Sequence, residues 1–177
     1  MTGDARKDYV ADGMTEEVIH LMAQQPQLHV AARTSSFMIQ DRDLTIAEIG
    51  EQLNVDAIVE GSVRHERGTQ RITVQLIHAA TGGHKGSVTV DIREDDLFAA
   101  QQLLGETIIS MLHAAGADVE LQPPEATKPA NALAYDLYLK ARTKLHQRSA
   151  ESLRDARALL YEAIRLDPNL APAHATL

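Results

Sequence analysis

The sequence contains no cysteine and no tryptophan, and aromatic residues make up only 3% of its 177 residues. Without cysteine, the chain cannot form a disulfide, use a thiolate as a nucleophile or bind zinc through sulfur. With so few aromatic rings, we expect neither an aromatic cage for a ligand nor a platform on which nucleic-acid bases stack.

Clustered positive charge and long apolar runs are also missing from the sequence. The formal net charge is −8, whereas proteins that bind nucleic acid neutralise its phosphates with clustered Lys and Arg. No apolar run approaches the ~20 residues that a membrane-spanning helix needs. The sequence therefore predicts no contact with nucleic acid and none with a membrane within this stretch of chain.

Three consecutive segments between Asp56 and Ile92 alternate apolar and polar residues with a period of two. Their apolar or small positions are Ala57, Val59, Gly61 and Val63, then Ile72, Val74 and Leu76, then Val88, Val90 and Ile92. Residues 66–69 and 80–83, which separate the segments, are rich in turn-forming residues. This pattern predicts an antiparallel meander that helices cover on one face only.

Three helices are predicted around this meander. The first begins with Thr15 as its N-cap and ends before Pro26. The second opens with the capping-box pair Thr45 and Glu48, and the third follows the acidic residues 94–96. Together with the meander they predict a mixed α/β layer with its helices on one face.

Two shorter segments lie between the first and second predicted helices. The apolar run of residues 28–32 predicts a strand buried on both faces, and residues 33–42 are predicted to form a loop. Such a strand usually lies beside a parallel neighbour, yet no strand-like segment precedes the first helix. We therefore expect the sheet to lack one strand.

The last third of the chain has a different pattern. Residues 118–131 are Pro-rich and charged and have no periodicity, which predicts a linker. Two amphipathic helices are predicted next, over residues 132–147 and 152–166, and the start of a third follows. We predict three parts: an α/β domain over residues 8–117, the linker, and an all-α helical repeat over residues 132–177.

The last part resembles a tetratricopeptide repeat (TPR). The residues at the spacing of that repeat's second helix are Ala156, Leu160, Ala163 and Pro168. Ala141 stands where the pattern prefers glycine in the first helix, and a second repeat begins at Ala171 and is cut off at Leu177. Because such repeats bury their faces by stacking, the resemblance implies a truncated array that continues in the natural protein.

The first part resembles the TolB-like amino-terminal domain that precedes TPR arrays in many bacterial proteins. The matching segments are YVADGMTEE (9–17), ARTSSF (32–37), IGEQLNVD (49–56), EGSVR (60–64), RITVQLI (71–77), ATG (80–82) and DLFAAQ (96–101). The resemblance implies a sensory or scaffolding segment that follows a nucleotide-cyclase, winged-helix DNA-binding or kinase domain. It also implies a protein that is often tethered by one membrane helix, with this segment on the cytoplasmic or the periplasmic side.

The sequence departs from this family at two places. Members usually begin with an apolar strand just before the segment that matches Gly3 and Asp4, and this strand is absent here. An unfilled place in a sheet exposes unpaired backbone groups, so we expect self-association as a homodimer or by strand exchange. Where members commonly carry Trp and Tyr in the third meander strand, this chain has Gly86 and Val90, so no aromatic-lined site is expected.

No catalytic, cofactor-binding or metal-binding site is predicted. The eight histidines include no His-x-x-x-His pair. His78 and His84 could face each other across a hairpin turn, but solvated turn residues are the simpler interpretation. The glycine-rich residues 81–86 precede a strand rather than the helix N-terminus that a phosphate-binding loop uses, which favours an ordinary turn.

One face of the first repeat helix is predicted to bind a protein or peptide partner. Its residues are Tyr135, Tyr138, Arg142, Leu145 and His146. Tyr and Arg are enriched among the residues that dominate protein interfaces, and this face lines the groove of stacked repeats. The alternative interpretation is that these residues pack against the first domain or against a following repeat.

The sequence thus favours a non-enzymatic sensory or scaffolding module for protein–protein interaction within a larger bacterial signalling protein, linked to a cyclase or a transcription regulator. The alternative is a small-molecule-binding or enzymatic α/β domain that uses the polar face of the meander. That face carries Glu60, Arg64, Arg71, Thr73 and Gln75. A purely structural spacer is a third hypothesis.

Overall fold

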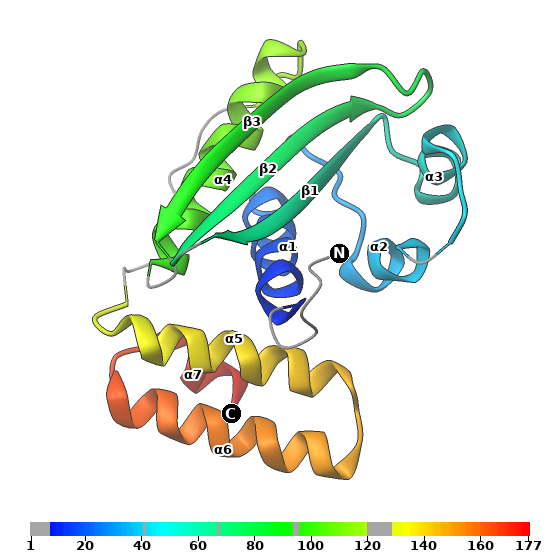
Figure 1. Ribbon diagram of the computed structural model, residues 1–177. Coiled ribbons are helices and arrows are strands. Elements are labelled where there is room, and N and C mark those ends of the chain that lie inside the picture. The colour runs from blue at the N-terminus through cyan, green and yellow to red at the C-terminus, as the bar shows by residue number, and fades with distance from the viewer. Residues whose placement is uncertain (1–7, 41, 67, 94–95, 120–128) are drawn as a thin grey trace.

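The computed structural model describes residues 8–40, 42–66, 68–93, 96–119 and 129–177. The elements, in chain order, are α1 (Asp8–Ala23), α2 (Arg33–Ile39), α3 (Ile46–Leu53), β1 (Ala57–Glu66), β2 (Thr69–His78), β3 (His84–Arg93), α4 (Leu97–Ala114), α5 (Ala132–His146), α6 (Ala150–Leu166) and α7 (Ala171–Thr176). The chain is a mixed α/β layer followed by a pair of long helices, α5 and α6 (Figure 1). The predicted fold class is confirmed.

The sheet is an antiparallel meander in the order β1-β2-β3. Val63 of β1 lies opposite Ile72 of β2, and Ile72 lies opposite Val90 of β3. Since residues opposite each other share a face, this register gathers the apolar positions of the alternating pattern on one side of the sheet. Figure 1 shows α1 and α4 together on one side of this sheet.

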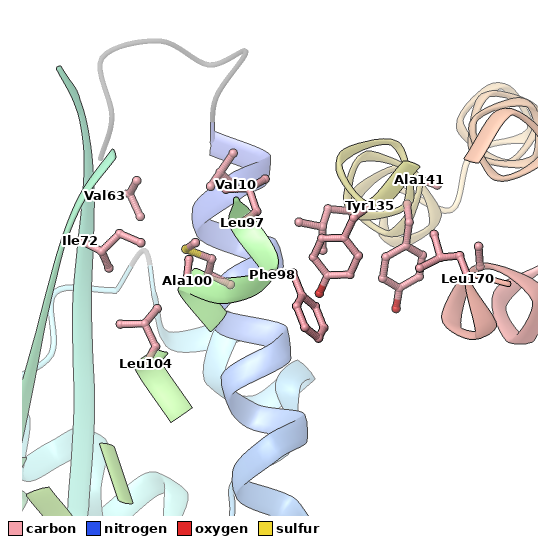
Figure 2. Close-up of a cluster of buried hydrophobic side chains, with 14 of the residues drawn as sticks. Val10, Val63, Ile72, Leu97, Phe98, Ala100, Leu104, Tyr135, Ala141 and Leu170 are labelled. Carbon is pink, nitrogen blue, oxygen red and sulfur yellow. The ribbon is translucent and has the colours of Figure 1, made fainter. Parts of the chain in front are cut away.

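The apolar face of the sheet and the helices share one buried cluster. Ile72 and Leu104 of α4 are each only 2% exposed, and Figure 2 shows both inside this cluster. The same cluster continues through Tyr135 of α5 to Leu170, which precedes α7. The core of the α/β layer is therefore continuous with the core of the helical pair.

Gly86 allows α4 to approach β3 closely. A Cβ atom at this position would lie 2.9 Å from the sulfur of Met111, which already fills the space beside the strand. Val90, on the same face, packs half-buried against the core. At the two positions where the TolB-like family commonly has aromatic rings, the sheet is thus covered by α4.

The first helix begins earlier than the sequence predicts. Thr15 is not an N-cap, because α1 begins at Asp8 and the Thr15 hydroxyl donates a hydrogen bond to the Ala11 carbonyl, 2.9 Å away, within the helix. Val10 and Met14 are 1% and 3% exposed. Their burial in the core extends the apolar stripe of the helix toward its N-terminus, and this tertiary contact outweighs the local capping signal.

The segment between α1 and α3 also differs from the prediction. Residues 28–32 have no regular secondary structure rather than forming a strand, and the predicted loop at residues 33–42 contains the helix α2. Within the described residues, no strand lies beside residues 28–32 to pair with them. The Arg33 guanidinium lies 4.0 Å from the centre of the Phe37 ring, and this i,i+4 contact supports the helical turn.

The predicted starts of the second and third helices are confirmed. Thr45 and Glu48 form both hydrogen bonds of a capping box at the start of α3, and Asn54 ends that helix in the left-handed conformation with φ of 51°. Asp96 caps α4 by accepting a hydrogen bond from the Ala99 N–H. Gly116 follows α4 with φ of 95°, a value that glycine adopts without strain.

The helical pair is capped at both starts. Asn131 accepts hydrogen bonds from the N–H groups of the first turn of α5, and Ser149 and Ser152 form a capping box at α6. The buried carboxylate of Asp167 accepts the N–H of Ala130 at 2.8 Å, so it joins the end of α6 to the start of α5. Most of the predicted linker, residues 120–128, lies outside the described residues.

Candidate functional site

The most charged buried contact in the described chain lies between α1, α2 and α5. We call it the α1–α5 junction, and it comprises Glu16 and Glu17 of α1, Arg33 of α2, and Arg142 and His146 of α5. Glu16 is at its centre, because its side chain is 2% exposed and faces three basic groups. The junction therefore connects the α/β layer to the helical pair.

Both oxygens of the Glu16 carboxylate are in ion pairs, although Oε2 accepts no hydrogen bond. Oε1 lies 2.6 Å from Arg33 Nε and 2.9 Å from His146 Nε2, and Oε2 lies 2.6 Å from Arg142 Nη2. The second guanidinium nitrogen of Arg142, Nη1, pairs with Glu17. One guanidinium thus bridges two adjacent carboxylates.

The spacing of residues along α5 explains why these groups meet. Tyr138, Arg142 and His146 follow one another at intervals of four, so they share one face of the helix. This face lies against α1, which carries the two glutamates in sequence. Burial of Glu16 requires such partners, because an unpaired carboxylate in this position would cost several kcal/mol of stability.

Two tyrosines complete the contact on the apolar side. The Tyr135 ring packs edge-on against Phe98 of α4, with ring centres 5.5 Å apart (Figure 2), and its hydroxyl donates a hydrogen bond to Gln101. The Tyr138 hydroxyl accepts a hydrogen bond from Arg142 Nη1 at 3.2 Å. α5 is therefore held to α4 by Tyr135 and to α1 by Arg142.

Burial determines the protonation of these groups. Removal from water raises the pKa of Tyr135 and of Tyr138 above the ordinary value of 10.0, so both remain neutral hydroxyls at physiological pH. Burial alone would lower the pKa of Arg142, but the opposing influence of Tyr138, Glu17 and Glu16 leaves it raised. Arg142 is therefore a permanent cation in the junction.

The structure brings all five residues of the predicted partner-binding face to the junction or beside it. Tyr135 and Tyr138 are 4% and 6% exposed, Leu145 is half-buried against the core, and the side chains of Arg142 and His146 are 21% and 38% exposed. Their packing on α1 and α4 corresponds to the alternative interpretation of the sequence. That this face binds a partner remains a prediction.

Sequence reasoning missed the acidic half of the junction. Glu16 and Glu17 directly follow Thr15, the predicted N-cap, and negative charge there is favourable at a helix start. In the structure both residues lie in the middle of α1. Arg33 falls in the predicted loop of residues 33–42, whereas it begins α2. Glu17 and Arg142 are 125 residues apart in the chain, and no local pattern in the sequence signals a pairing over that distance.

The predicted alternative site occupies the polar face of the sheet. Its members Glu60, Arg64, Arg71, Thr73 and Gln75 share this face in the observed register. Arg71 forms a bidentate ion pair with Asp91 of β3 at 2.7 and 2.8 Å, and hydrogen bonding to Arg71 lowers the pKa of that carboxyl. Thr73 contacts Thr89 at 3.1 Å. The β2–β3 half of the face is therefore paired internally.

The histidine pair considered at the second hairpin is not formed across the ladder. His84 lies opposite Ile77, where the register shifts, and His78 Nδ1 lies 3.2 Å from the Thr81 hydroxyl. In the part of the chain that the structure describes, no group of three or more His, Asp or Glu residues is arranged to hold a metal ion. Nor does any described helix combine the length and apolar character needed to cross a bilayer.

Comparison with known proteins aligns the chain with part of a longer protein. It is 34% identical over all 177 of its residues to a Rhizobium meliloti (strain 1021) protein named "Putative adenylate cyclase 3". The chain spans 30% of the length of that protein. No protein-family model matches the sequence. The whole chain therefore aligns with one region of that longer protein.

Proposed function

We propose that this chain is a non-enzymatic sensory and scaffolding segment of a longer bacterial signalling protein that contains an adenylate cyclase. In this proposal residues 8–117 are a TolB-like amino-terminal domain, residues 118–131 a linker, and residues 132–177 the opening of a TPR array. The alignment with the Rhizobium meliloti protein supports the link to a cyclase. The ordered family-like motifs of the sequence support the two domain assignments.

The observation that carries the proposal is the α1–α5 junction. A scaffold must hold its interaction helices in one orientation, and a sensor must transmit a change from one part of the molecule to another. Arg33 and Arg142 contact the buried Glu16 carboxylate from two different helices. Movement of α5 relative to α1 would therefore break ion pairs, whereas two purely apolar surfaces could slide past each other.

The proposed partner is a protein or peptide that engages the α5 face containing Tyr138, Arg142 and His146. In this chain Glu16 and Glu17 already pair with Arg142. An acidic partner would compete with α1 for this guanidinium, so its binding would be coupled to release of α5 from α1. That coupling is the signal we propose the segment transmits.

The first test asks whether the chain itself is catalytic. The purified chain is incubated with ATP and Mg²⁺ or Mn²⁺, and cyclic AMP is quantified by mass spectrometry. We expect no cyclic AMP above a protein-free control. Formation of cyclic AMP that disappears when the chain is heat-denatured would contradict a non-enzymatic role.

The second test asks whether the segment controls a cyclase. The aligned region of the Rhizobium meliloti protein is replaced by this chain, and cyclic AMP output is compared with that of the same hybrid carrying Arg142→Gln. We expect the substitution to change the output. Lys144→Gln, at an α5 side chain that is 40% exposed and pairs with Asp155, should leave the output unchanged. If an unrelated domain of similar size in the same place gave the same output, the segment would be a spacer.

The polar sheet face supports a second candidate function, the binding of a small polar molecule. The favouring observation is that Glu60 and Arg64 lie exposed on this face and, within the described residues, form no hydrogen bond or ion pair. A thermal-shift screen of metabolites tests this, since a ligand at about 100 times its dissociation constant adds about 2.7 kcal/mol to the free energy of unfolding. A rise in melting temperature that Arg64→Ala abolishes would support this candidate function. A screen in which no compound raises the melting temperature would contradict it.

A further inference from the structure

β1 is an exposed edge of the sheet. Among the described residues, β2 is its only strand neighbour (Figure 1). Six of the eight residues from Ala57 to Arg64 are exposed, whereas in β2 only Arg71 is. A long exposed edge presents unpaired N–H and C=O groups that readily pair with another strand.

Two charged side chains of this edge, Glu60 and Arg64, have no partner within the described chain. Glu60 and Arg64 point to the same face of β1, but they are four residues apart, roughly 13 Å along a strand, which is too far for them to pair with each other. Neither forms a hydrogen bond or an ion pair elsewhere in the described residues. Val59, on the opposite face, is apolar and 40% exposed.

The other edge of the sheet, β3, is also largely exposed, but its side chains differ from those of β1. On β3, Asp91 is already paired with Arg71 of β2. Val88 and Val90 are half-buried against the core beneath α4. Lys85 of β3 also lacks a partner among the described residues. Only the β1 edge combines two unpaired charges of opposite sign with an exposed large apolar side chain.

We propose that two copies of this chain associate through their β1 edges, as antiparallel strands related by a two-fold axis at Ser62. In this register Glu60 of each copy lies opposite Arg64 of the other, which forms two symmetric ion pairs on the polar face. On the apolar face Gly61 lies opposite Val63, so the valine meets no side chain. This inference is independent of the proposed function.

Symmetry and charge together select this register. A two-fold axis perpendicular to the sheet makes the two β1 strands antiparallel and keeps the helices of both copies on one side of the joined sheet. Each residue of the polar face therefore lies opposite a residue of the partner's polar face, and likewise for the apolar face. Centring the axis on Glu60 or on Arg64 would place like charges directly opposite each other. Centring it on Ser62 pairs both charges with their opposites.

Charge reversal tests the register. Sedimentation equilibrium at low ionic strength, from micromolar to near-millimolar protein, is expected to show a monomer–dimer equilibrium. Glu60→Arg or Arg64→Glu alone should raise the dimer dissociation constant about tenfold or more. The double variant carrying both changes should return to within about threefold of the original value. A monomer throughout the range, or a double variant as weak as the single ones, would overturn the proposal.

A single engineered thiol tests the geometry directly, because the chain has no cysteine of its own. Ser62→Cys would place two thiols opposite each other at the axis, where Cα atoms about 4.5 to 5.5 Å apart suit a disulfide. We expect Ser62→Cys to form a covalent dimer under mild oxidation. Ser87→Cys, exposed on the same face of β3, is the matched control and should not. Equal crosslinking of the two variants, with folding verified by circular dichroism, would overturn the proposed axis.

Discussion

Arg142 of α5 forms an ion pair with Glu16 of α1 through atoms 2.6 Å apart, although the two helices lie near opposite ends of the chain. The same guanidinium pairs with Glu17 and donates a hydrogen bond to the Tyr138 hydroxyl. A single side chain therefore joins the first helix to the helical pair. We therefore expect the stability of the whole chain to be sensitive to a single substitution at Arg142.

Replacing Arg142 with Gln should destabilise the chain markedly. Breaking a buried ion pair costs about 3 to 5 kcal/mol when the remaining charge is left alone. Glu16 keeps its contacts with Arg33 and His146, so we expect a smaller loss, about 2 to 3 kcal/mol in the free energy of unfolding. Urea denaturation followed by circular dichroism measures this loss.

Lys144→Gln is the matched control for that experiment. Lys144 lies on the same helix and pairs with Asp155 at 3.1 Å, but both side chains are at least 40% exposed. An exposed pair of this kind contributes about 0 to 1 kcal/mol. If the two variants lost similar stability, or if Glu16→Gln and Arg142→Gln were additive in a double-mutant cycle, the junction would not act as we describe.

Removing the Tyr135 hydroxyl should also weaken the contact between α5 and α4. Tyr135→Phe keeps the ring packed on Phe98 but leaves the buried Oε1 of Gln101 without its donor. An unsatisfied buried polar group costs about 1 to 3 kcal/mol. Tyr161→Phe, at a side chain that is 50% exposed, serves as the control and should change stability by less than about 0.5 kcal/mol. Equal melting temperatures for the two variants would contradict the assigned hydrogen bond.

Gly50 lies where α3 touches the end of β2. A Cβ atom at Gly50 would lie 2.6 Å from the Cβ of Ala79, and neither atom can move without its backbone. Gly50→Ala should therefore lower the free energy of unfolding by about 1 to 2 kcal/mol, even though alanine is the better helix former. Adding Ala79→Gly should restore much of the loss in thermal denaturation. If Gly50→Ala were more stable than the original chain, the contact between Gly50 and Ala79 would be looser than described.

Elements with local determinants could be predicted from the sequence. The meander follows from alternation within each strand, and α3 follows from the pair Thr45 and Glu48 at its start and Asn54 at its end. All of these signals lie within a few residues of the structure they specify. Packing against the rest of the chain does not alter them.

Elements that depend on distant contacts could not be predicted in the same way. Thr15 is a good N-cap residue by type, but burial of Val10 and Met14 keeps the chain helical before it. The apolar residues 28–32 suit a strand, yet no strand beside them in the described chain offers hydrogen bonds. In both cases tertiary contacts decided between two locally acceptable conformations.

The candidate site was predictable on one side only. Tyr138, Arg142 and His146 share a face at four-residue spacing, and that spacing is visible in the sequence. What covers the face is not visible, because Glu16 is an ordinary helical glutamate until the fold buries it beside Arg33 and Arg142. The partner of a charged side chain is thus decided by how the chain folds in three dimensions and not by the local spacing of residues.

The capping box of α3 should make stability depend on acidity in a defined direction. The Glu48 carboxylate accepts the Thr45 N–H at 2.8 Å, and this backbone hydrogen bond, with one from the Thr45 hydroxyl, lowers the pKa of Glu48 below its ordinary value of 4.5. Because the folded-state pKa is the lower one, the stabilisation is complete above pH 4.5 and is lost as the pH falls through the folded-state value. Glu48→Gln lacks the titration, so the chain should exceed this variant in stability at pH 7, and the difference should disappear in acid. Urea denaturation of both proteins over this pH range measures the difference, and a gap that stayed constant with pH would show that the carboxylate does not stabilise the helix start.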